Sequence, residues 1–197
     1  MLNLRRFASR DGLTQFYVAL DHFTNCSKFI AALGHENPLL RILEIGAGTG
    51  GATAPILKAL TLENGHRMYS KYTYTDIFAG VFMNARGRFQ DYSSLEFKTL
   101  DITKDVVEQG FEEHRYDLIV ASNVLHATGS LFDTLTNVRK LLGPHRRVYL
   151  QELNLVIQMC NFIMGILPGW WLGESNGRIL QPYISPERWE QEFRNAG

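Results

Sequence analysis

The stretch Leu40-Arg-Ile-Leu-Glu-Ile-Gly-Ala-Gly-Thr-Gly50 decides the fold. It begins as a short apolar strand, Leu40 to Ile45, and continues into a turn with three alternating glycines, Gly46, Gly48 and Gly50. Glycine lacks a Cβ, so these positions allow a sharp turn and a close approach of the backbone to a ligand. A strand, a glycine turn and a helix in this order hold nucleotide-like cofactors at the carboxyl ends of parallel strands. The stretch therefore predicts a cofactor site.

The acidic residue ahead of the glycines, Glu44, separates two classes of cofactor. Gly46, Gly48 and Gly51 also satisfy G-x-G-x-x-G, the dinucleotide fingerprint, which is weak by itself. In a dinucleotide site the helix N-terminus faces a pyrophosphate, which Glu44 would repel. S-adenosylmethionine (SAM) has no phosphate, and its sulfonium and ammonium groups would favour the carboxylate. The stretch resembles the E-x-G-x-G-x-G pattern of class I methyltransferases, and SAM is preferred over NAD.

The rest of the chain alternates strand and helix patterns. Further strands are predicted at 71–75, 95–100, 116–122 and 147–152, and helices at 13–33, 52–62, 81–89, 131–142, 155–166 and from Pro186 onward. Gly34 is expected to stop the first helix, and Gly143-Pro144 to stop the helix over 131–142. This alternation predicts an α/β fold: a Rossmann-like, mostly parallel sheet with helices on both faces.

The domain organisation follows from this pattern. Residues 1–37 are expected to form a helical lid segment, and residues 38–197 a single methyltransferase core. A methyltransferase sheet normally continues into an antiparallel pair of strands where this chain stops. We therefore expect the final antiparallel strands to be absent and the chain to be a fragment of a multidomain synthase.

Composition excludes several classes of partner. The chain has 197 residues, a formal net charge of +0 and 45% hydrophobic residues, so no basic excess exists to bind nucleic acid or an anionic membrane. Its longest apolar run, 153–172, is interrupted by polar residues, proline and glycine, and makes a poor membrane span. The two cysteines have neither metal nor redox spacing, which predicts no metal and a cytoplasmic protein with reduced thiols.

Polar residues collect at the predicted carboxyl ends of the strands, where ligands of such sheets bind. The second strand ends in Asp76-Ile77, whose carboxylate can accept from both ribose hydroxyls, and the third in Asp101-Ile102, placed to accept from an adenine amino group. The predicted cofactor-binding residues are Glu44, Gly46, Gly48, Gly50, Asp76, Ile77, Asp101, Ile102 and Asn123.

His126 and Glu152 are the candidate catalytic residues. His126 follows the end of the fourth strand, beside the expected methyl donor, and histidine is the side chain best matched to proton abstraction near neutral pH. Glu152 ends the neighbouring strand and could fix the tautomer of the imidazole. The alternatives are an ordinary loop histidine and a glutamate in a salt bridge or a solvated strand end. Trp170 and Trp171 are either core residues or the lining of an acyl or pantetheine channel.

Several segments together resemble one family, the C-methyltransferase domain of fungal highly reducing polyketide synthases. The specific ones are Ala121-Ser-Asn-Val-Leu-His-Ala-Thr128 and Leu167-Pro-Gly-Trp-Trp-Leu-Gly173; Leu43–Gly51, Tyr74–Ile77 and Val138–Leu142 agree with them. The resemblance, over about residues 38–197, implies SAM-dependent methylation of the α-carbon of a β-ketoacyl chain. The chain would be held on an acyl carrier protein as a phosphopantetheine thioester, beside neighbouring synthase domains. It also implies a histidine–glutamate dyad at His126 and Glu152.

Three other functions remain open at this point. A small-molecule O- or N-methyltransferase could also use His126 as its base, and the Trp170-Trp171 segment discriminates against it. A catalytically silent pseudo-methyltransferase could act as a scaffold within a megasynthase, although the glycines and acids of the site are all present. An NAD-dependent oxidoreductase is disfavoured by Glu44 and by the lack of a recognisable hydride-transfer constellation.

Overall fold

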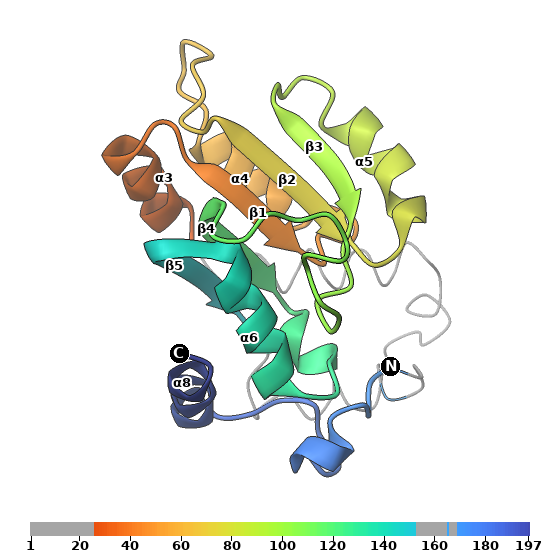
Figure 1. The fold of residues 1–197 in the computed structure, drawn as a ribbon. Helices are drawn as coiled ribbons and strands as arrows, with labels where there is room; N and C mark the ends of the chain where they lie inside the picture. Colours follow the sequence, from red (N-terminus) through yellow and green to blue (C-terminus); the bar gives the residue numbers. More distant parts are fainter. Residues whose placement is uncertain (1–25, 153–164, 166–168) are drawn as a thin grey trace, which may run out of the picture.

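Five strands form one parallel sheet in the part of the chain that the structure describes. The structure, a computed structural model, describes residues 26–152, 165 and 169–197 (Figure 1). The strands are β1 (Arg41–Ile45), β2 (Lys71–Asp76), β3 (Leu95–Thr99), β4 (Tyr116–Ser122) and β5 (Leu142–Gln151). Their order is β3-β2-β1-β4-β5, and every neighbouring pair is parallel. The order reverses between β1 and β4, which is where doubly wound sheets bind their ligands.

Helices cover both faces of this sheet, as the alternation predicted (Figure 1). The helical elements are α3 (Ser27–Glu36), α4 (Thr53–Ala59), η1 (Ala79–Val81), α5 (Phe82–Arg88), η2 (Leu125–Ala127), α6 (Leu131–Leu141), η3 (Glu174–Asn176) and α8 (Pro186–Asn195). Side chains alternate across each strand. Leu43 and Ile119 therefore join the core under α6 and α8, whereas Ile42 and Leu118 join the core under α3, α4 and α5. The predicted fold class is confirmed.

The first described helix ends later than the sequence predicted. Helix α3 continues to Glu36, and Gly34, the expected stop, lies inside it. A Cβ at Gly34 would lie 2.6 Å from Leu60 and 2.9 Å from Met68, so this glycine allows a close approach between α3 and its neighbours rather than a cap. The helix instead ends before Pro38, which cannot donate a backbone hydrogen bond. Of the lid segment predicted over residues 1–37, residues 1–25 lie outside the described residues. Its described part includes α3, which packs against α4.

Residues 100–115, between β3 and β4, form turns, and no helix was predicted there; their apolar side chains Ile102, Val106 and Phe111 enter the core. One other boundary differs, at β5. Helix α6 ends at Leu141, just before the expected Gly143-Pro144 stop, but strand β5 begins at Leu142 rather than at the predicted 147, with a register irregularity against Tyr116 and Leu118. The helix predicted over 155–166 lies outside the described residues, apart from 165. The predicted start of α8 is confirmed, since the Ser185 side chain accepts from the backbone N–H of Arg188.

Three buried tyrosines next to β2 predict unfolding in alkali. Burial raises the pKa of Tyr69 to about 12, and burial together with the Glu44 charge raises the pKa values of Tyr72 and Tyr74 even more. In the unfolded chain these phenols ionise near pH 10. Stability is therefore complete below about pH 10 and is lost as the pH rises towards the folded values, by about 1.4 kcal/mol per pH unit for each phenol.

The measurement is urea unfolding at pH values from about 9 to 11.5, with tyrosinate absorbance followed in parallel. We expect the free energy of unfolding to fall along this range and tyrosinate to appear together with unfolding. Tyr72→Phe should reduce the slope against pH by one proton. A free energy of unfolding that stays level would contradict the assignment.

Candidate functional site

A cavity of about 390 Å³ opens at the carboxyl ends of the strands. This volume lies within the range of about 300–1,000 Å³ that is common for small-molecule sites. The cavity is lined by residues from the ends of β1, β2, β3 and β4: Glu44–Thr49, Gly51, Ala52, Asp76, Ile77, Leu100–Thr103, Ser122–Val124, Ala127 and Thr128. The lining residues include three acids and no Lys, Arg or His. Among the described residues, a ligand with phosphate groups would therefore find no cationic side chain on these walls.

The glycine loop is held in its turn by contacts to β2 and α5. Gly46, Gly48 and Gly50 have φ of +62°, +57° and +81°, the left-handed region in which other residues are strained. The hydroxyl of Tyr74 donates to the carbonyl of Gly48 at 2.8 Å, and the guanidinium of Arg88 to that of Thr49 at 2.6 Å. Gly46 and Gly48 line the cavity as expected. Gly50 does not; a Cβ there would lie 2.5 Å from the ring of Phe89, so Gly50 serves packing.

Asp76 connects the glycine loop to the end of β2. Its Oδ2 accepts from the backbone N–H of Gly48 at 2.9 Å, and its Oδ1 accepts from that of Phe78 at 2.9 Å. The next residue, Ile77, lines the cavity and is largely exposed. A carboxylate oxygen has further lone pairs beyond one N–H bond, so Asp76 keeps acceptor capacity towards the cavity.

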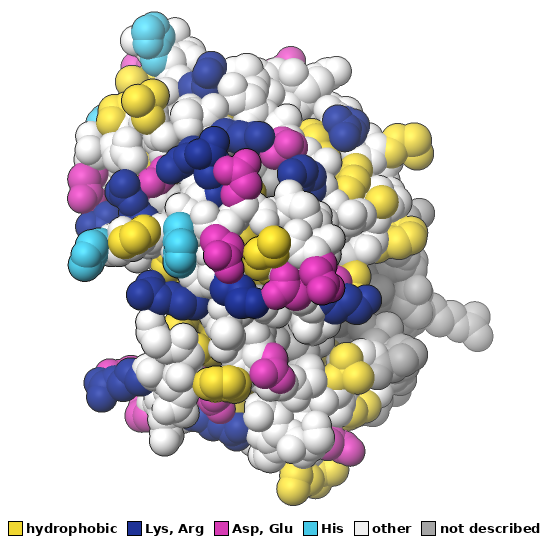
Figure 2. Space-filling model, in the orientation of Figure 1, with side chains coloured by type: hydrophobic (Ala, Val, Ile, Leu, Met, Phe, Trp, Pro, Cys, Tyr) yellow, Lys and Arg dark blue, Asp and Glu magenta, His cyan; other side chains and the backbone are white. Residues whose placement is uncertain are grey.

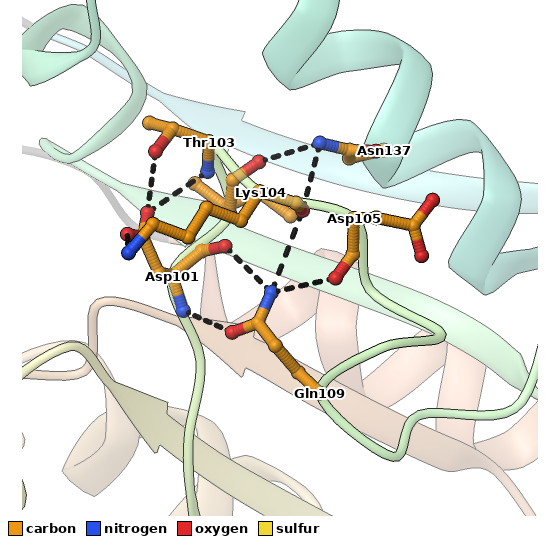
Figure 3. A network of polar contacts seen from close by, with 7 residues as sticks. Asp101, Thr103, Lys104, Asp105, Gln109 and Asn137 are labelled. Carbon is orange, nitrogen blue, oxygen red and sulfur yellow. Dashed lines mark hydrogen bonds and ion pairs between the residues drawn. The ribbon is translucent and has the colours of Figure 1, made fainter.

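Asp101 belongs to a polar network at the end of β3, next to the end of β2 (Figure 3). Its Oδ1 accepts from the backbone and hydroxyl of Thr103, at 3.1 and 2.6 Å, and its Oδ2 lies 3.1 Å from Nζ of Lys104. Partial burial acts to raise the pKa of Asp101, but the hydrogen bonds from Thr103 and Lys104 outweigh it and leave the pKa below its usual value. Gln109 ties the backbone of Asp101 to that of Asp105. Asp101 and Ile102 both line the cavity.

Glu44 lies deeper than the sequence suggested. It is 1% exposed, and its Oε2 accepts from the hydroxyls of Thr53 and Tyr72, each at 2.6 Å. Burial and the Glu44 charge raise the pKa of Tyr72 well above its usual value, so the phenol stays a donor. Glu44 lines the cavity, and its carboxylate joins β1 to α4 and β2 as well as giving that wall a negative charge.

Asn123 occupies a strained position at the end of β4. Its φ is +51°, which Asn tolerates better than most residues. The backbone N–H of Asn123 donates to the carbonyl of Gln151 on β5 at 2.7 Å, and the residue lines the cavity. The backbone then turns into η2, which carries His126.

His126 and Glu152 are in contact, as predicted. Nδ1 of His126 lies 2.5 Å from Oε2 of Glu152, and both side chains are about 5% exposed. The other oxygen, Oε1, accepts from the backbone N–H groups of Val124, Leu125 and His126, at 3.1, 2.7 and 3.4 Å. An ionised Glu152 makes Nδ1 the protonated nitrogen, and Nε2 then carries the lone pair. Neither residue lines the cavity, although their neighbours Val124, Ala127 and Thr128 do.

The two tryptophans have different surroundings. Trp170 is 4% exposed, and its ring meets His126 edge-on with centroids 5.4 Å apart. The Tyr183 ring contacts both, edge-on to Trp170 with centroids 5.7 Å apart and tilted against His126 with centroids 6.1 Å apart. Trp171 is half-buried, and its Nε1 donates to the carbonyl of Gly165 at 2.8 Å. Neither tryptophan lines the cavity, so their expected substrate contact stays a prediction.

No sequence pattern indicated a role for Arg178. This residue follows Gly177 in a polar stretch that reads as a surface loop, yet it is 2% exposed. Its guanidinium donates to the carbonyls of His126 and Thr128. The supporting roles of Tyr72, Tyr74 and Thr53 were also not predicted, because their partners lie far along the chain or on another element.

The remaining surface carries mixed charge. Figure 2 shows Lys and Arg side chains interleaved with Asp and Glu on the face that it presents. Lys71 lies 2.8 Å from Glu96, and Arg146 lies 3.1 Å from the buried carboxylate of Asp117. Among the described residues, no three His, Cys, Asp or Glu side chains group as metal ligands, and no helix is long and apolar enough to cross a membrane.

Comparisons with known proteins agree with this geometry. Residues 43–145 match the family model described as a methyltransferase domain. The chain is 59% identical over 187 residues to the highly reducing polyketide synthase gloL of Glarea lozoyensis, covering 95% of this chain and 7% of that protein. The crystal structure of the trans-methyltransferase CalH in complex with SAH matches with a TM-score of 0.93 and 45% identity, covering 100% of this chain and 55% of that one. CalH is a methyltransferase of Penicillium decumbens.

A third match comes from a domain of a larger synthase. The structure of the CMeT domain of the citrinin polyketide synthase has a TM-score of 0.72 and 33% identity, covering 81% of this chain and 40% of that one. The chain thus spans about half of these solved structures and a small part of the synthase that it matches.

Proposed function

Because this chain belongs to the methyltransferase domain family, as a carbon methyltransferase domain of the polyketide synthase type, we propose that it methylates the α-carbon of a β-ketoacyl thioester with SAM. The thioester would be carried on the phosphopantetheine arm of an acyl carrier protein, beside other synthase domains. The observation that carries the proposal is the contact of 2.5 Å between His126 and Glu152 next to a cavity with acidic walls. A base is what carbon methylation needs, because the α-proton must leave before the carbon can attack.

The cavity suits SAM by its chemistry. The backbone of the glycine loop provides close approach, Asp76 keeps acceptor capacity for a ribose diol, and Ile77 and Ile102 offer apolar contact to adenine. The acidic walls would stabilise a ligand with sulfonium and ammonium groups, and none of the lining residues is a cation for a pyrophosphate. When bound, SAM supplies an electrophilic methyl group.

The chain's own residues supply the base and its orientation. Glu152 holds Nδ1–H of His126, so Nε2 is the nitrogen that accepts the α-proton. The rings of Trp170 and Tyr183, packed against the imidazole, exclude water from the proton transfer. The enolate that remains on the substrate is then the nucleophile, and positioning supplies much of the remaining rate enhancement.

The direct test is methylation of a synthetic β-ketoacyl thioester, followed by mass spectrometry. We expect one methyl group on the α-carbon and none on oxygen. The matched control is the α,α-dimethyl analogue, which has no α-proton and should remain unmodified. A methyl group on oxygen rather than on the α-carbon of the unsubstituted thioester would indicate an O-methyltransferase, and the absence of any product while SAH binds would indicate a scaffold.

Asp76→Ala is expected to weaken SAH binding by about 2 kcal/mol, or about 30-fold, because charge-assisted hydrogen bonds to the ligand are lost. Isothermal titration calorimetry measures this change. Asp76→Asn keeps an oxygen that can accept from Gly48 N–H, and separates the anchoring of the loop from the charge. The control is Asp91→Ala, at an exposed position that does not line the cavity. Wild-type affinity in Asp76→Ala would remove this residue from the site.

A further inference from the structure

Arg178 is a buried cation whose partners are backbone carbonyls. Its Nη1 donates to the carbonyl of His126 at 2.6 Å and to that of Pro182 at 3.4 Å. Its Nη2 donates to the carbonyls of Thr128 and Gly129, the latter at 3.3 Å. No carboxylate lies within ion-pair distance of the guanidinium among the residues that the structure describes. Three of the four acceptors belong to one short loop, the His126–Gly129 loop.

A charge in this position is costly for stability. Burial, and then the charge of Arg188, lower the pKa of the Arg178 guanidinium, while Glu192 and Glu152 act in the opposite direction. An apolar side chain of similar length would fill the space without desolvating a cation, but it would leave these carbonyls without their donor. Packing alone therefore does not account for an arginine here. The need to orient the carbonyls accounts for the arginine, because the planar guanidinium can donate to several acceptors at once and fix their positions.

Hydrogen bonds hold the backbone around the His126–Gly129 loop through both its N–H groups and its carbonyls. Glu152 accepts from the backbone N–H groups at the start of η2, and Arg178 donates to backbone carbonyls nearer its end. The segment that carries Arg178 also provides Trp170 and Tyr183, whose rings contact the imidazole. One guanidinium thus joins this segment to the loop that bears the proposed base.

We propose that Arg178 is a positioning residue for His126: its guanidinium fixes the His126–Gly129 loop, and with it the place from which the imidazole accepts the substrate proton. The inference rests on the proposed function of His126 as the base. Arg178 itself does not line the cavity and touches neither cofactor nor reacting atoms. It acts through the loop, so its loss should change turnover rather than cofactor affinity.

Gly173 gives a second way to test the contact. A Cβ on Gly173 would overlap the guanidinium of Arg178, at Cζ and Nε. The φ of Gly173 is −81°, an ordinary value for any residue, so alanine adds no backbone strain there. Gly173→Ala therefore displaces the guanidinium while leaving Arg178 in the sequence.

The experiment compares steady-state kinetics, SAH titration and thermal unfolding for four variants: Arg178→Met, Arg178→Ala, Gly173→Ala and Arg188→Met. Arg178→Met and Gly173→Ala should lower kcat about 30- to 100-fold, since displacement of a catalytic group by about 1 Å costs on that order. The KM for SAM and the Kd for SAH should change much less than kcat, because the loop contributes only Ala127 and Thr128 to the cavity and the walls from β1 to β3 are untouched. Arg188→Met is the matched control: Arg188 contacts Glu192 and the carbonyl of Asn176, not the loop, and its kcat should be unchanged.

Chemical rescue separates positioning from general destabilisation. Millimolar guanidinium should restore part of the kcat of Arg178→Ala, whereas urea, its neutral analogue, should not. Wild-type kcat in Arg178→Met, or rescue by urea as well as guanidinium, would overturn the proposal. So would a fall of kcat and SAH affinity together with the melting temperature.

A measurement without turnover keeps the proposal separate from the proposed function. With ¹⁵N-labelled histidine, the ring resonances of His126 should move in Arg178→Met and Gly173→Ala and stay in place in Arg188→Met. Unmoved resonances in the first two variants would overturn the positioning role. If instead they move but the wild type methylates no β-ketoacyl thioester, the proposed function fails while the control of the imidazole by Arg178 stands.

Discussion

His126→Ala is expected to reduce methyl transfer by about three orders of magnitude while SAH binds as tightly as to the wild type. Loss of a general base typically costs 10²–10⁴-fold, and here no other described imidazole lies beside Glu152 to replace it. The imidazole does not line the cavity, so its removal leaves the cofactor walls in place. Single-turnover mass spectrometry measures the transfer, and calorimetry measures the binding of SAH.

Exchange of the α-proton isolates the step that we assign to His126. In deuterated buffer with SAH bound, the wild type should exchange the α-proton of the thioester faster than the uncatalysed background, and His126→Ala should not. His126→Asn keeps a donor to Glu152 without a base, and should behave like alanine. The control is His66→Ala, at an exposed histidine. Methylation at the wild-type rate in either His126 variant would disprove the assignment of the base.

Glu152→Ala is expected to reduce both turnover and stability. Its carboxylate fixes Nδ1 of His126 and accepts from three backbone N–H groups. Loss of the orienting carboxylate should lower kcat by roughly 10³-fold, and buried N–H groups without an acceptor should lower the free energy of unfolding by about 2–3 kcal/mol. Steady-state assays and urea unfolding measure the two quantities.

Glu152→Gln separates these two roles. Its amide oxygen can still accept from the loop N–H groups, but the amide nitrogen is a donor and favours the wrong tautomer of His126. We therefore expect stability close to the wild type with activity as low as in Glu152→Ala. A glutamine variant with high activity would show that the negative charge and the tautomer are unimportant, and that Glu152 is only an anchor.

Local sequence patterns were enough for the sheet and for the set of strand-end residues. Strand β4 matches its predicted bounds, because the apolar run Leu118–Ala121 within it is typical of a central strand of a parallel sheet. Asp76, Asp101 and Asn123 reach the cavity because parallel strands bring their carboxyl ends to one edge. The contact between His126 and Glu152 follows from the same rule, since β4 and β5 are neighbours.

What sequence reasoning missed depends on three-dimensional packing. Whether Gly34 caps a helix or lets another helix approach depends on Leu60 and Met68, which no local pattern specifies. Gly50 resembles Gly46 in the motif but faces Phe89. The partner of Arg178 is a loop about 50 residues earlier, and a lone arginine between polar neighbours gives no sign of burial.

The parallel pairing of the sheet also determines when each half of the site can form. Gly48 finds its anchor, Asp76, 28 residues later, and Val124 finds Glu152 after the same interval. The His126–Gly129 loop acquires its contact from Arg178 only 52 residues after His126, and the ring contact from Tyr183 comes later still. Chains emerge from the ribosome N-terminus first. The glycine loop can therefore form on the nascent chain before Arg178 has been synthesised to stabilise the His126–Gly129 loop. A ribosome stalled before residue 178 would carry a chain in which only the glycine-loop half of the site can form.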